Sequence, residues 1–443
     1  MSLLNRLFQL EERGSTVGRE LRGALATFLT MSYIVVANPA ILQAAGIPFD
    51  AAMACTALAA GICCLLMGFV ANFPVALASG MGLNAVIAFQ IAKLTGSWQT
   101  AMGLIVLDGL VVLALVLCGL REAMMHAIPR DLRRAIGAGI GLFIALIGLV
   151  NARLVVVPLG TLAELAKNPA STLPPVTYGS ISAPDTAVAV FGLCLTAWLL
   201  ARRYRGAIVL GIAASTALAL VLGVTHWPSG FAWPNFSILF QADVAGALKL
   251  QFLPMLLAIL LVDFFDTLGT ITAVSESAGL QDSEGRIPRL RDILIVDSMS
   301  ASIGGFCGAS SVTCYIESAA GVAEGARTGL HSVFVGLMFL ACILAAPVVG
   351  MIPQAATAPA LILVGFLMCA PIARIDFEQL DEAIPAFVTL VTLPFTYSIT
   401  HGIGYGFITF VIIKVLSLKF REVHPLMAGA AALFLGYFAF GAF

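Results

Sequence analysis

Charged residues are scarce in this sequence. Asp, Glu, Lys and Arg make up 11% of the 443 residues, whereas about a quarter of an average soluble protein is charged. Hydrophobic residues make up 60%, and the mean hydropathy is +1.02. The net charge is −1, and no basic surface suggests a nucleic-acid partner. This composition excludes a soluble globular protein and indicates an integral membrane protein.

The sequence also lacks the cysteine spacing of a metal site. Its nine cysteines are an odd number, all lie in apolar segments, and no CxxC pair occurs. We therefore interpret them as small core residues and expect no disulfide, no metal and no cofactor. A cleaved signal peptide is not predicted, because charged residues precede the first long apolar run: Arg6, Glu11, Glu12, Arg13, Arg19 and Glu20.

Apolar runs of about twenty residues recur along the whole chain. As a helix, each is long enough to cross roughly 30 Å of hydrocarbon, and none alternates like a barrel strand. The predicted spans are 21–44, 51–71, 98–119, 131–150, 184–201, 206–224, 247–277, 290–305, 328–348, 356–373, 380–400, 402–419 and 425–441. Segments 73–92 and 306–323 are expected to cross differently. The fold class is therefore an all-α polytopic membrane protein, with one partial crossing near the C-terminus.

The basic residues predict the orientation of the chain. With the N-terminus in the cytosol, most of them fall in three cytosolic loops, which contain Arg121, Arg130, Arg133 and Arg134; Arg202, Arg203 and Arg205; and Arg286, Arg289 and Arg291. Only Lys93, Arg153, Lys167 and Lys249 are left outside. This is a strong positive-inside bias, and it predicts a multi-pass protein of the cytoplasmic membrane with a cytosolic N-terminus.

Two parts of the chain resemble each other. Residues 67–86 can be laid over 304–323 without a gap, and residues 128–153 resemble 352–374. A duplicated architecture explains both matches, and chance similarity between apolar segments is the alternative. Since the second copy begins after an odd number of crossings, the two copies would be inverted, as in many transporters with a site near the bilayer midplane.

The overlaid segments are poor continuous helices. Pro74 removes a backbone donor, and Ser79, Gly80, Gly82 and Asn84 weaken helix propensity. Their counterparts in the second copy are Gly308, Ser310, Ser311, Thr313 and Gly321. We expect a short extended piece that leads into a half-helix in each copy. Two such half-helices would direct free N–H groups and partial positive charge at one ligand site.

Six acidic residues lie in or beside apolar stretches of the second half: Asp263, Asp266, Glu276, Asp297, Glu317 and Glu324. A carboxylate in the bilayer core costs at least about 2 kcal/mol, so each needs a partner, a proton or water. Asp263, Asp266 and Thr270 share one helical face, where two close carboxylates favour one that carries a proton. The alternative is that these carboxylates accept hydrogen bonds from Ser or Thr hydroxyls between helices.

Other polar and small residues have two interpretations each. Glu317 either caps its own broken helix or accepts hydrogen bonds from the N–H groups of a heterocycle. Asn84 either binds a ligand or packs helices, and Asp297 either lines the same cavity or pairs within the core. The glycine-rich run GAGIGLFIALIG (137–148) is interpreted as a helix-packing seam that includes Gly137.

Seven runs together resemble the adenine/guanine/hypoxanthine permease family of the nucleobase–ascorbate, or nucleobase–cation symporter, group. They are TFLTMSYIVVANPAIL, GMGLNA, DFFDTLGT, SSVTCYIESAAG, ARTGL, APALILVG and LPFTYSITHGIGYGF, and they occur in the family's order. The resemblance implies a fold similar to uracil permease, with about fourteen segments in two inverted repeats of seven. It also implies a core domain (1–127 and 245–350) and a gate domain (128–244 and 351–443).

The resemblance implies roles for individual residues. Asp266 stands where the wider group has the acid that binds the base and couples the proton, and Glu317, Gly82 and Asn84 match residues of the same pocket. Thr313 is grouped with the substrate-binding residues, and the base would stack near Phe264, Phe265 or Tyr315. Asp263 and Asp297 are the other candidates for proton coupling. Ser79 replaces the family's usual proline, which leaves the fine substrate preference open.

We therefore expect a proton-coupled importer of purine nucleobases: adenine, guanine or hypoxanthine. Its partners would be the base, a proton and the bilayer, and a homodimer is a possible assembly. One alternative is a transporter of xanthine or uracil. Another is an anion carrier or channel on the same fold, which would need a basic residue between the half-helices. A membrane enzyme is not expected, since no nucleophile–base pair or metal-ligand set occurs at membrane depth.

Overall fold

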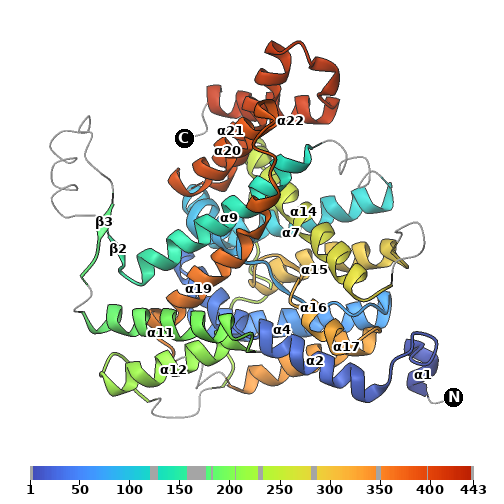
Figure 1. Cartoon of the computed structure of the whole chain (residues 1–443), viewed down its shortest axis with the longest axis vertical. Helices are drawn as coiled ribbons and strands as arrows, with labels where there is room; N and C mark the ends of the chain where they lie inside the picture. Colours follow the sequence, from blue (N-terminus) through green and yellow to red (C-terminus); the bar gives the residue numbers. More distant parts are fainter. Residues whose placement is uncertain are drawn as a thin grey trace.

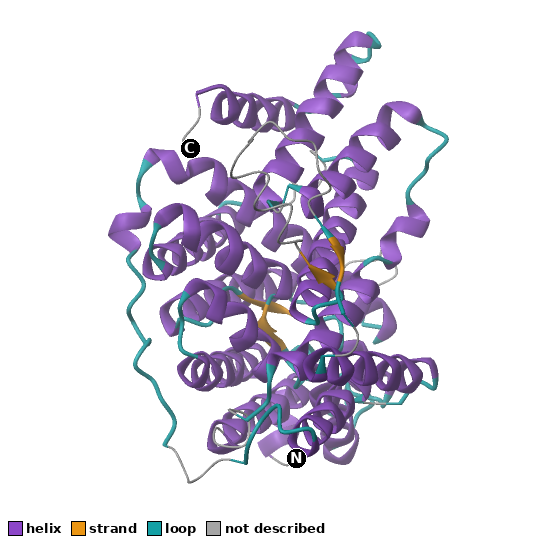
Figure 2. Ribbon diagram, turned by 90° about the vertical axis from the view of Figure 1, so that its left-hand side faces the viewer, coloured by secondary structure: helices purple, strands orange, loops and turns teal. Residues whose placement is uncertain are grey.

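A computed structural model describes residues 3–119, 128–156, 176–180, 183–204, 206–227, 233–280, 287–345, 351–396 and 398–440. Side chains inside α14 are described only in part. These residues form a bundle of helices in which strands account for two small patches (Figure 2). Among the described residues, six helices are long and apolar enough to cross a membrane, and six shorter apolar helices accompany them. The protein is thus an all-helical membrane protein with several apolar spans, while the count of fourteen crossings stays a prediction.

The first half of the chain contains α1 (Leu3–Phe8), α2 (Val17–Met31), α3 (Ile34–Leu42), η1 (Gln43–Ala45), α4 (Phe49–Leu66), η2 (Met67–Ala71), β1 (Leu77–Ser79), α5 (Met81–Ala85), η3 (Val86–Ile91), α6 (Ala92–Thr95), α7 (Trp98–Leu117), α9 (Arg130–Asn151), β2 (Val155–Val156), β3 (Thr177–Tyr178), α11 (Pro184–Ala201) and α12 (Ala207–Val221). The predicted span 21–44 is interrupted at Ser32, between α2 and α3.

The second half contains α13 (Val244–Ala247), η4 (Leu250–Phe252), α14 (Leu253–Ser277), α15 (Leu290–Cys307), β4 (Val312–Cys314), α16 (Ser318–Ala323), α17 (Gly329–Cys342), η5 (Ile343–Ala345), α19 (Gln354–Met368), η6 (Ala370–Arg374), α20 (Leu380–Phe395), α21 (Ile399–Leu416), η7 (Phe420–Glu422) and α22 (Pro425–Phe440). Each predicted apolar span is therefore mainly helical where the structure describes it.

The helices pack in two groups (Figure 1). In the first group α4 packs on α15 and α17, α7 packs on α15, and α2 packs on α16 and α17. In the second group α9 packs on α19 and α20, and α11 packs on α12 and α19. Helix α14 contacts both groups, because it touches α7, α16 and β4 as well as α9 and α21. The division of the chain into core and gate domains stays a prediction.

Helices α9 and α19 belong to the two stretches that resemble each other in sequence, and they approach closely. Gly141 and Gly365 face each other, so a Cβ on either one would collide with the backbone oxygen of the other. Small residues at such crossings let membrane helices approach to backbone contact. The packing seam predicted for residues 137–148 is confirmed at Gly141.

The two broken segments meet as a two-stranded antiparallel sheet. Strand β1 pairs with β4, with Leu77 opposite Cys314, Ala78 opposite Thr313 and Ser79 opposite Val312. Beyond the ladder, Gly80 N–H donates to the Ser311 carbonyl at 2.9 Å, and Tyr315 N–H donates to the Ala76 carbonyl at 3.0 Å. Each strand leads into a helix, α5 after β1 and α16 after β4. The expectation of an extended piece followed by a half-helix is confirmed in both copies.

The two copies differ in the link between strand and helix. The half-helices begin at Met81 and Ser318, which the sequence overlay aligns. The strands do not follow the overlay. The overlay aligns Ala78 with Tyr315. In the antiparallel ladder Ala78 is instead the central residue of β1 and lies opposite Thr313, the central residue of β4, so the two strands correspond with a shift of two residues. The second copy therefore has a link that is longer by Tyr315 and Ile316.

A second antiparallel pair, β2 with β3, has no counterpart among the predicted elements. It joins Val155 to Tyr178 and Val156 to Thr177. Each strand has only two residues, and such short extended pieces carry no periodic signal.

The hydroxyl of Ser318 joins the two broken segments, because it accepts the N–H of Ala76 at 3.0 Å. We predict that Ser318→Ala lowers the free energy of unfolding by about 1–3 kcal/mol, since the Ala76 N–H is left buried without this acceptor. Thermal unfolding of the purified protein in detergent measures the change.

Ser298→Ala is the matched control. Ser298 is equally buried, but its hydroxyl donates only to the Leu294 carbonyl of its own helix, a type of bond whose loss costs a helix little. Equal losses for the two variants would contradict the role given to Ser318.

Candidate functional site

A cavity of about 510 Å³ lies where the two helix groups meet. The first broken segment and α14 form one side of it, and α9 and the α19–η6 region form the other. Its lining residues are Gly80, Gly82, Leu83, Arg133, Ile136, Gly137, Ile140, Val262, Thr270, Ile316, Leu367, Met368, Ala370, Pro371 and Arg374. Cavities of roughly 300–1,000 Å³ with a few polar groups are typical small-molecule sites.

The first half-helix presents its N-terminal end to this cavity. Gly80 is the N-cap of α5, and both Gly80 and Gly82 line the cavity. Their hydrogen side chains leave the backbone accessible from the cavity. A Cβ on Gly82 would lie 2.9 Å from Ile140 of α9, so this glycine also sets how closely α5 and α9 approach. Gly82 therefore lies where the sequence predicted it, beside a cavity.

The prediction for Gly137 is wrong. Gly137 lines the cavity, and a Cβ on it would meet no atom within 4 Å. It does not pack against another helix, unlike Gly141 of the same run. Helical spacing alone could not distinguish the two, because residues four apart lie on the same face of a helix.

Helix α14 carries a polar face toward β4. Asp263 is fully buried and accepts the Ser311 hydroxyl at 3.2 Å. Thr267 bonds the Thr313 hydroxyl at 2.9 Å, and Thr270, one turn further along, lines the cavity. The face predicted from the sequence thus runs from the strands to the cavity. The side chains of Asp266, Phe264 and Phe265 lie outside the described residues.

Asp297 holds the second strand in place. It accepts the Thr267 hydroxyl at 2.7 Å, the Cys314 N–H at 3.2 Å and the Thr313 hydroxyl at 3.4 Å. These bonds join α15, α14 and β4 at a buried position. Neither Asp297 nor Thr313 lines the cavity. The contacts favour the interpretation of Asp297 as a core partner, and they place Thr313 in the same network.

Glu317 stands at the start of the second half-helix, where it is the N-cap residue of α16. Its carboxylate accepts the Tyr33 hydroxyl at 3.2 Å, and its neighbour Ile316 lines the cavity. Tyr33 was not predicted from the sequence, although it is the single phenol in the run TFLTMSYIVV. A hydroxyl donor keeps a carboxylate satisfied at this depth until another donor replaces it.

Tyr315 and Ser79 fasten the two strands. The Tyr315 hydroxyl donates to the Ser79 carbonyl, and the Ser79 hydroxyl donates to the Ala309 carbonyl. Ser79 is fully buried and is absent from the cavity lining. The residue that departs from the family pattern thus bonds to the protein backbone.

Asn84 is fully buried, and neither its amide oxygen nor its nitrogen has a hydrogen-bond partner in the part of the chain that the structure describes. Asn38, another fully buried asparagine, donates to the Thr56 hydroxyl at 2.8 Å and to the Ala309 carbonyl at 3.1 Å. A buried polar group without a partner costs about 1–3 kcal/mol, so such groups are rare and call for an explanation. The contacts thus give Asn84 no packing bond among the described residues, and its role as a ligand-binding amide stays a prediction.

Two arginines also line the cavity, Arg133 of α9 and Arg374 of η6. The sequence placed Arg133 in a cytosolic loop and gave Arg374 no role, because both stand at the ends of apolar runs. The fold brings the two segments together, because the guanidinium of Arg134, next to Arg133, donates to the Arg374 carbonyl.

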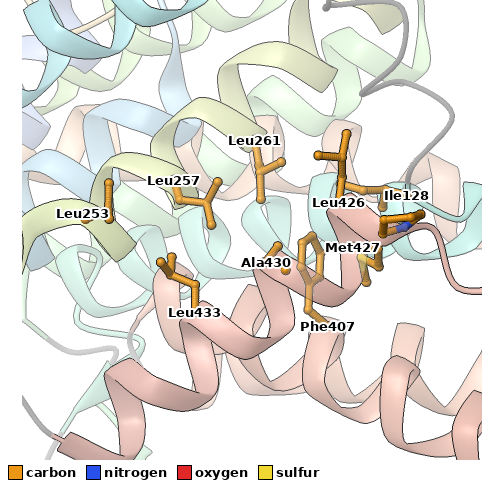
Figure 3. A pocket seen from close by; sticks show the side chains of 11 residues that line it. Ile128, Leu253, Leu257, Leu261, Phe407, Leu426, Met427, Ala430 and Leu433 are labelled. Carbon is orange, nitrogen blue, oxygen red and sulfur yellow. The ribbon is translucent and has the colours of Figure 1, made fainter.

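A second cavity, of about 360 Å³, lies between α14 and the C-terminal helices α21 and α22. Figure 3 shows Leu253, Leu257 and Leu261 of α14 facing Phe407 and Leu433. Its lining side chains are apolar, so it offers no polar group that would orient a small ligand. The cavity lined by Gly80, Gly82 and Thr270 is therefore the candidate site.

Comparisons with known proteins agree on a transport fold. The Xan_ur_permease model, described as "Permease family", matches residues 18–404. The chain is 40% identical over 434 residues to adenine permease AdeQ of Escherichia coli (strain K12), covering 97% of this chain and 95% of that one. It is 37% identical over 456 residues to guanine/hypoxanthine permease PbuG of Bacillus subtilis (strain 168), covering 98% and 99%.

Solved structures share the fold at low sequence identity. The transmembrane domain of a cyanobacterium bicarbonate transporter, BicA, superposes with a TM-score of 0.60 and 18% identity, covering 86% of this chain and 97% of that chain. The structure of SLC26A9 superposes with a TM-score of 0.63 and 14% identity, covering 90% and 66%.

The difference between the two buried asparagines gives a prediction. Asn84→Leu should leave the free energy of unfolding of the ligand-free protein unchanged or raise it, because an unpartnered amide is replaced by an apolar group of similar size. Asn38→Leu should lower the same quantity by about 1–3 kcal/mol, since two hydrogen bonds are lost. Thermal unfolding of both variants without ligand measures the contrast. If Asn84→Leu is as destabilising as Asn38→Leu, the Asn84 amide has a structural partner.

Proposed function

This chain is a member of the Xan_ur_permease family and hence a membrane permease rather than an enzyme, and we propose that it imports purine nucleobases together with protons. The named substrates of its relatives, adenine in one case and guanine or hypoxanthine in another, support a purine as cargo. Each is a planar heterocycle with N–H donors and ring acceptors.

The observation that carries the proposal is the amide of Asn84, which has no hydrogen-bond partner among the described residues and lies on the half-helix whose Gly82 and Leu83 line the cavity. An amide offers both a donor and an acceptor, as does the edge of a purine. The backbone at Gly80 and Gly82 lies beside the same cavity without side chains. A base that enters between the two helix groups would therefore meet hydrogen-bonding groups of both kinds at one wall.

Glu317 is the proposed anchor on the second half-helix. Its carboxylate would exchange the Tyr33 hydroxyl, now 3.2 Å away, for N–H donors of the base. Such charge-assisted bonds are roughly twice as strong as bonds between neutral groups. Phe264, Phe265 and Tyr315 are the proposed aromatic neighbours of the base. Thr313 would contribute indirectly, because its hydroxyl bonds to the hydroxyl of Thr267 on α14.

Asp266 is the proposed proton carrier, with Asp263 and Asp297 as the other candidates. Asp297 already accepts three hydrogen bonds from α14 and β4, which supports a structural role. Asp266 lies between Asp263 and Thr270 on a helix that reaches from the strands to the cavity. A proton on this helix would thus be gained or lost next to the bound base.

We further propose that transport uses fourteen segments in two inverted repeats of seven, with the core (1–127 and 245–350) moving against the gate (128–244 and 351–443). The antiparallel pairing of β1 with β4 and the contact of α9 with α19 support a two-fold relation between the copies. The basic clusters support a cytosolic N-terminus. The site would face each side of the membrane in turn.

An anion carrier is the second candidate, because Arg133 and Arg374 line the cavity and because a bicarbonate transporter shares the fold. A panel of purines, xanthine, uracil, bicarbonate and sulfate, each competing with one radiolabelled purine in proteoliposomes, separates the candidates. Competition by purines alone supports the proposal, and competition by the inorganic anions alone overturns it.

Glu317→Gln should weaken purine binding by about 10- to 100-fold, which corresponds to roughly 1.4–2.7 kcal/mol, since the amide offers only one acceptor oxygen and presents a donor to the N–H groups of the base. Equilibrium binding of the labelled purine measures the loss, with Tyr33→Phe as the control. Tyr33→Phe removes the present donor but keeps the carboxylate, so it should still bind. Full binding by a folded Glu317→Gln protein would refute the assignment.

Asp266→Asn should abolish accumulation of purine driven by a pH gradient while equilibrium binding survives, because an amide cannot carry a proton. Uptake at several imposed pH gradients and binding are measured on the same preparation. Asp297→Asn should instead lower thermal stability. If Asp266→Asn still accumulates purine in response to the gradient, the coupling role belongs to Asp263, to Asp297 or to no carboxylate at all.

A further inference from the structure

The cavity has a basic end that a neutral base does not use. Among its described lining residues, Arg133 and Arg374 are the charged ones, and both are cationic. They are close in the fold, because Arg134 of the same turn as Arg133 donates to the carbonyl of Arg374. One end of the cavity thus favours an anion.

Gly82 of the proposed base site packs against Ile140, which lies seven residues after Arg133 on α9, roughly 10 Å along the helix axis. The whole volume of about 510 Å³ lies within the range of roughly 300–1,000 Å³ that accommodates a drug-sized molecule. A bicyclic base alone fills only part of such a space. A ligand that used both ends would carry a planar base at one end and an anionic group at the other.

Guanidinium groups bind phosphate with a planar fork of N–H donors, often two bonds at a time. A purine with a phosphate at the far side of a ribose has this composition. We propose that a purine nucleoside 5′-monophosphate binds in this cavity, with its phosphate at Arg133 and Arg374 and its base toward Gly80 and Gly82, and that it thereby inhibits transport. The proposal rests on the proposed function, because the base end is the purine site.

The bound nucleotide would block the carrier rather than cross. A dianionic phosphate in the bilayer interior costs far more than a neutral base, so it would stay at the arginine end. Arg133 belongs to a basic cluster on the side predicted to be cytosolic. On that side, attachment of ribose phosphate to an imported base yields this kind of molecule. Inhibition would therefore link uptake to the amount of product of that reaction.

A role in membrane topology requires only positive charge at these positions, which lysine also supplies. Phosphate binding through a fork requires arginine. The two lysine variants, Arg133→Lys and Arg374→Lys, should therefore keep membrane insertion but bind phosphate less well. The two glutamine variants, Arg133→Gln and Arg374→Gln, should remove the phosphate site. Arg130→Gln is the matched control, because Arg130 lies one turn before Arg134 on the same helix but lines a separate polar cavity with Lys414 and His424.

The test is displacement of a radiolabelled purine from the purified protein in phosphatidylcholine nanodiscs. Guanosine 5′-monophosphate, adenosine 5′-monophosphate, the two nucleosides and inorganic phosphate are compared. We expect the better monophosphate to displace the base at a concentration at least about tenfold lower than its nucleoside, which is about 1.4 kcal/mol. This advantage should vanish in the Gln variants, shrink in the Lys variants and persist in Arg130→Gln.

Equal potency of monophosphate and nucleoside in the wild-type protein would overturn the proposal. So would an advantage that survives in both Gln variants, or one that disappears for the wild type in phosphatidylglycerol nanodiscs, since a lipid headgroup would then hold the arginines. If the labelled purine does not bind at all, the proposed function fails instead. The two failures are therefore distinguishable.

Discussion

Backbone N–H and C=O groups that leave a helix at membrane depth have no water to bond to, and each group left unsatisfied costs several kcal/mol. In this protein two chain segments leave their helices at the same place and satisfy one another. The ladder between β1 and β4, extended by Gly80 and Tyr315, supplies the missing partners. The direction of both half-helices follows from this pairing, and so does the position of everything attached to them.

Buried side chains hydrogen-bond to the ladder and to the residues beside it. Asp297, Thr267 and Ser318 bond to the strands or to the residues beside them. The cavity lining instead contains Gly80 and Gly82, and two residues further along α5 lies Asn84, whose amide has no hydrogen-bond partner among the described residues. A rigid support behind a site that keeps unused hydrogen-bonding groups is what preorganised ligand binding requires. This separation of supporting residues from lining residues explains why Asp297 can be buried beside the ladder without lining the cavity.

Much of this arrangement could be predicted from the sequence, because its signals are local. Apolar length predicted the helices, and Pro74 with the glycines of both copies predicted the broken segments. The partners of Asp297 and Glu317 could not be predicted, since Thr267, Cys314 and Tyr33 come from other elements and carry no local pattern. The same holds for Gly137, Arg133 and Arg374, whose exposure to the cavity depends on how α9 is rotated against α19. Rotation about a helix axis is set by tertiary packing, which periodicity alone does not reveal for a helix that is apolar on most sides.

The longer link in the second copy has a consequence for energetics. Tyr315 and Ile316 lie between β4 and α16, and nothing corresponds to them between β1 and α5. Two copies of unequal length cannot trade places to give a state of equal packing. Under the proposed alternating access, the inward- and outward-facing forms then differ in free energy even without substrate or gradient. A difference of about 1.4 kcal/mol would already make one form tenfold more populated. The carrier would rest mainly on one side of the membrane, and its apparent affinity for cargo would differ between the two sides.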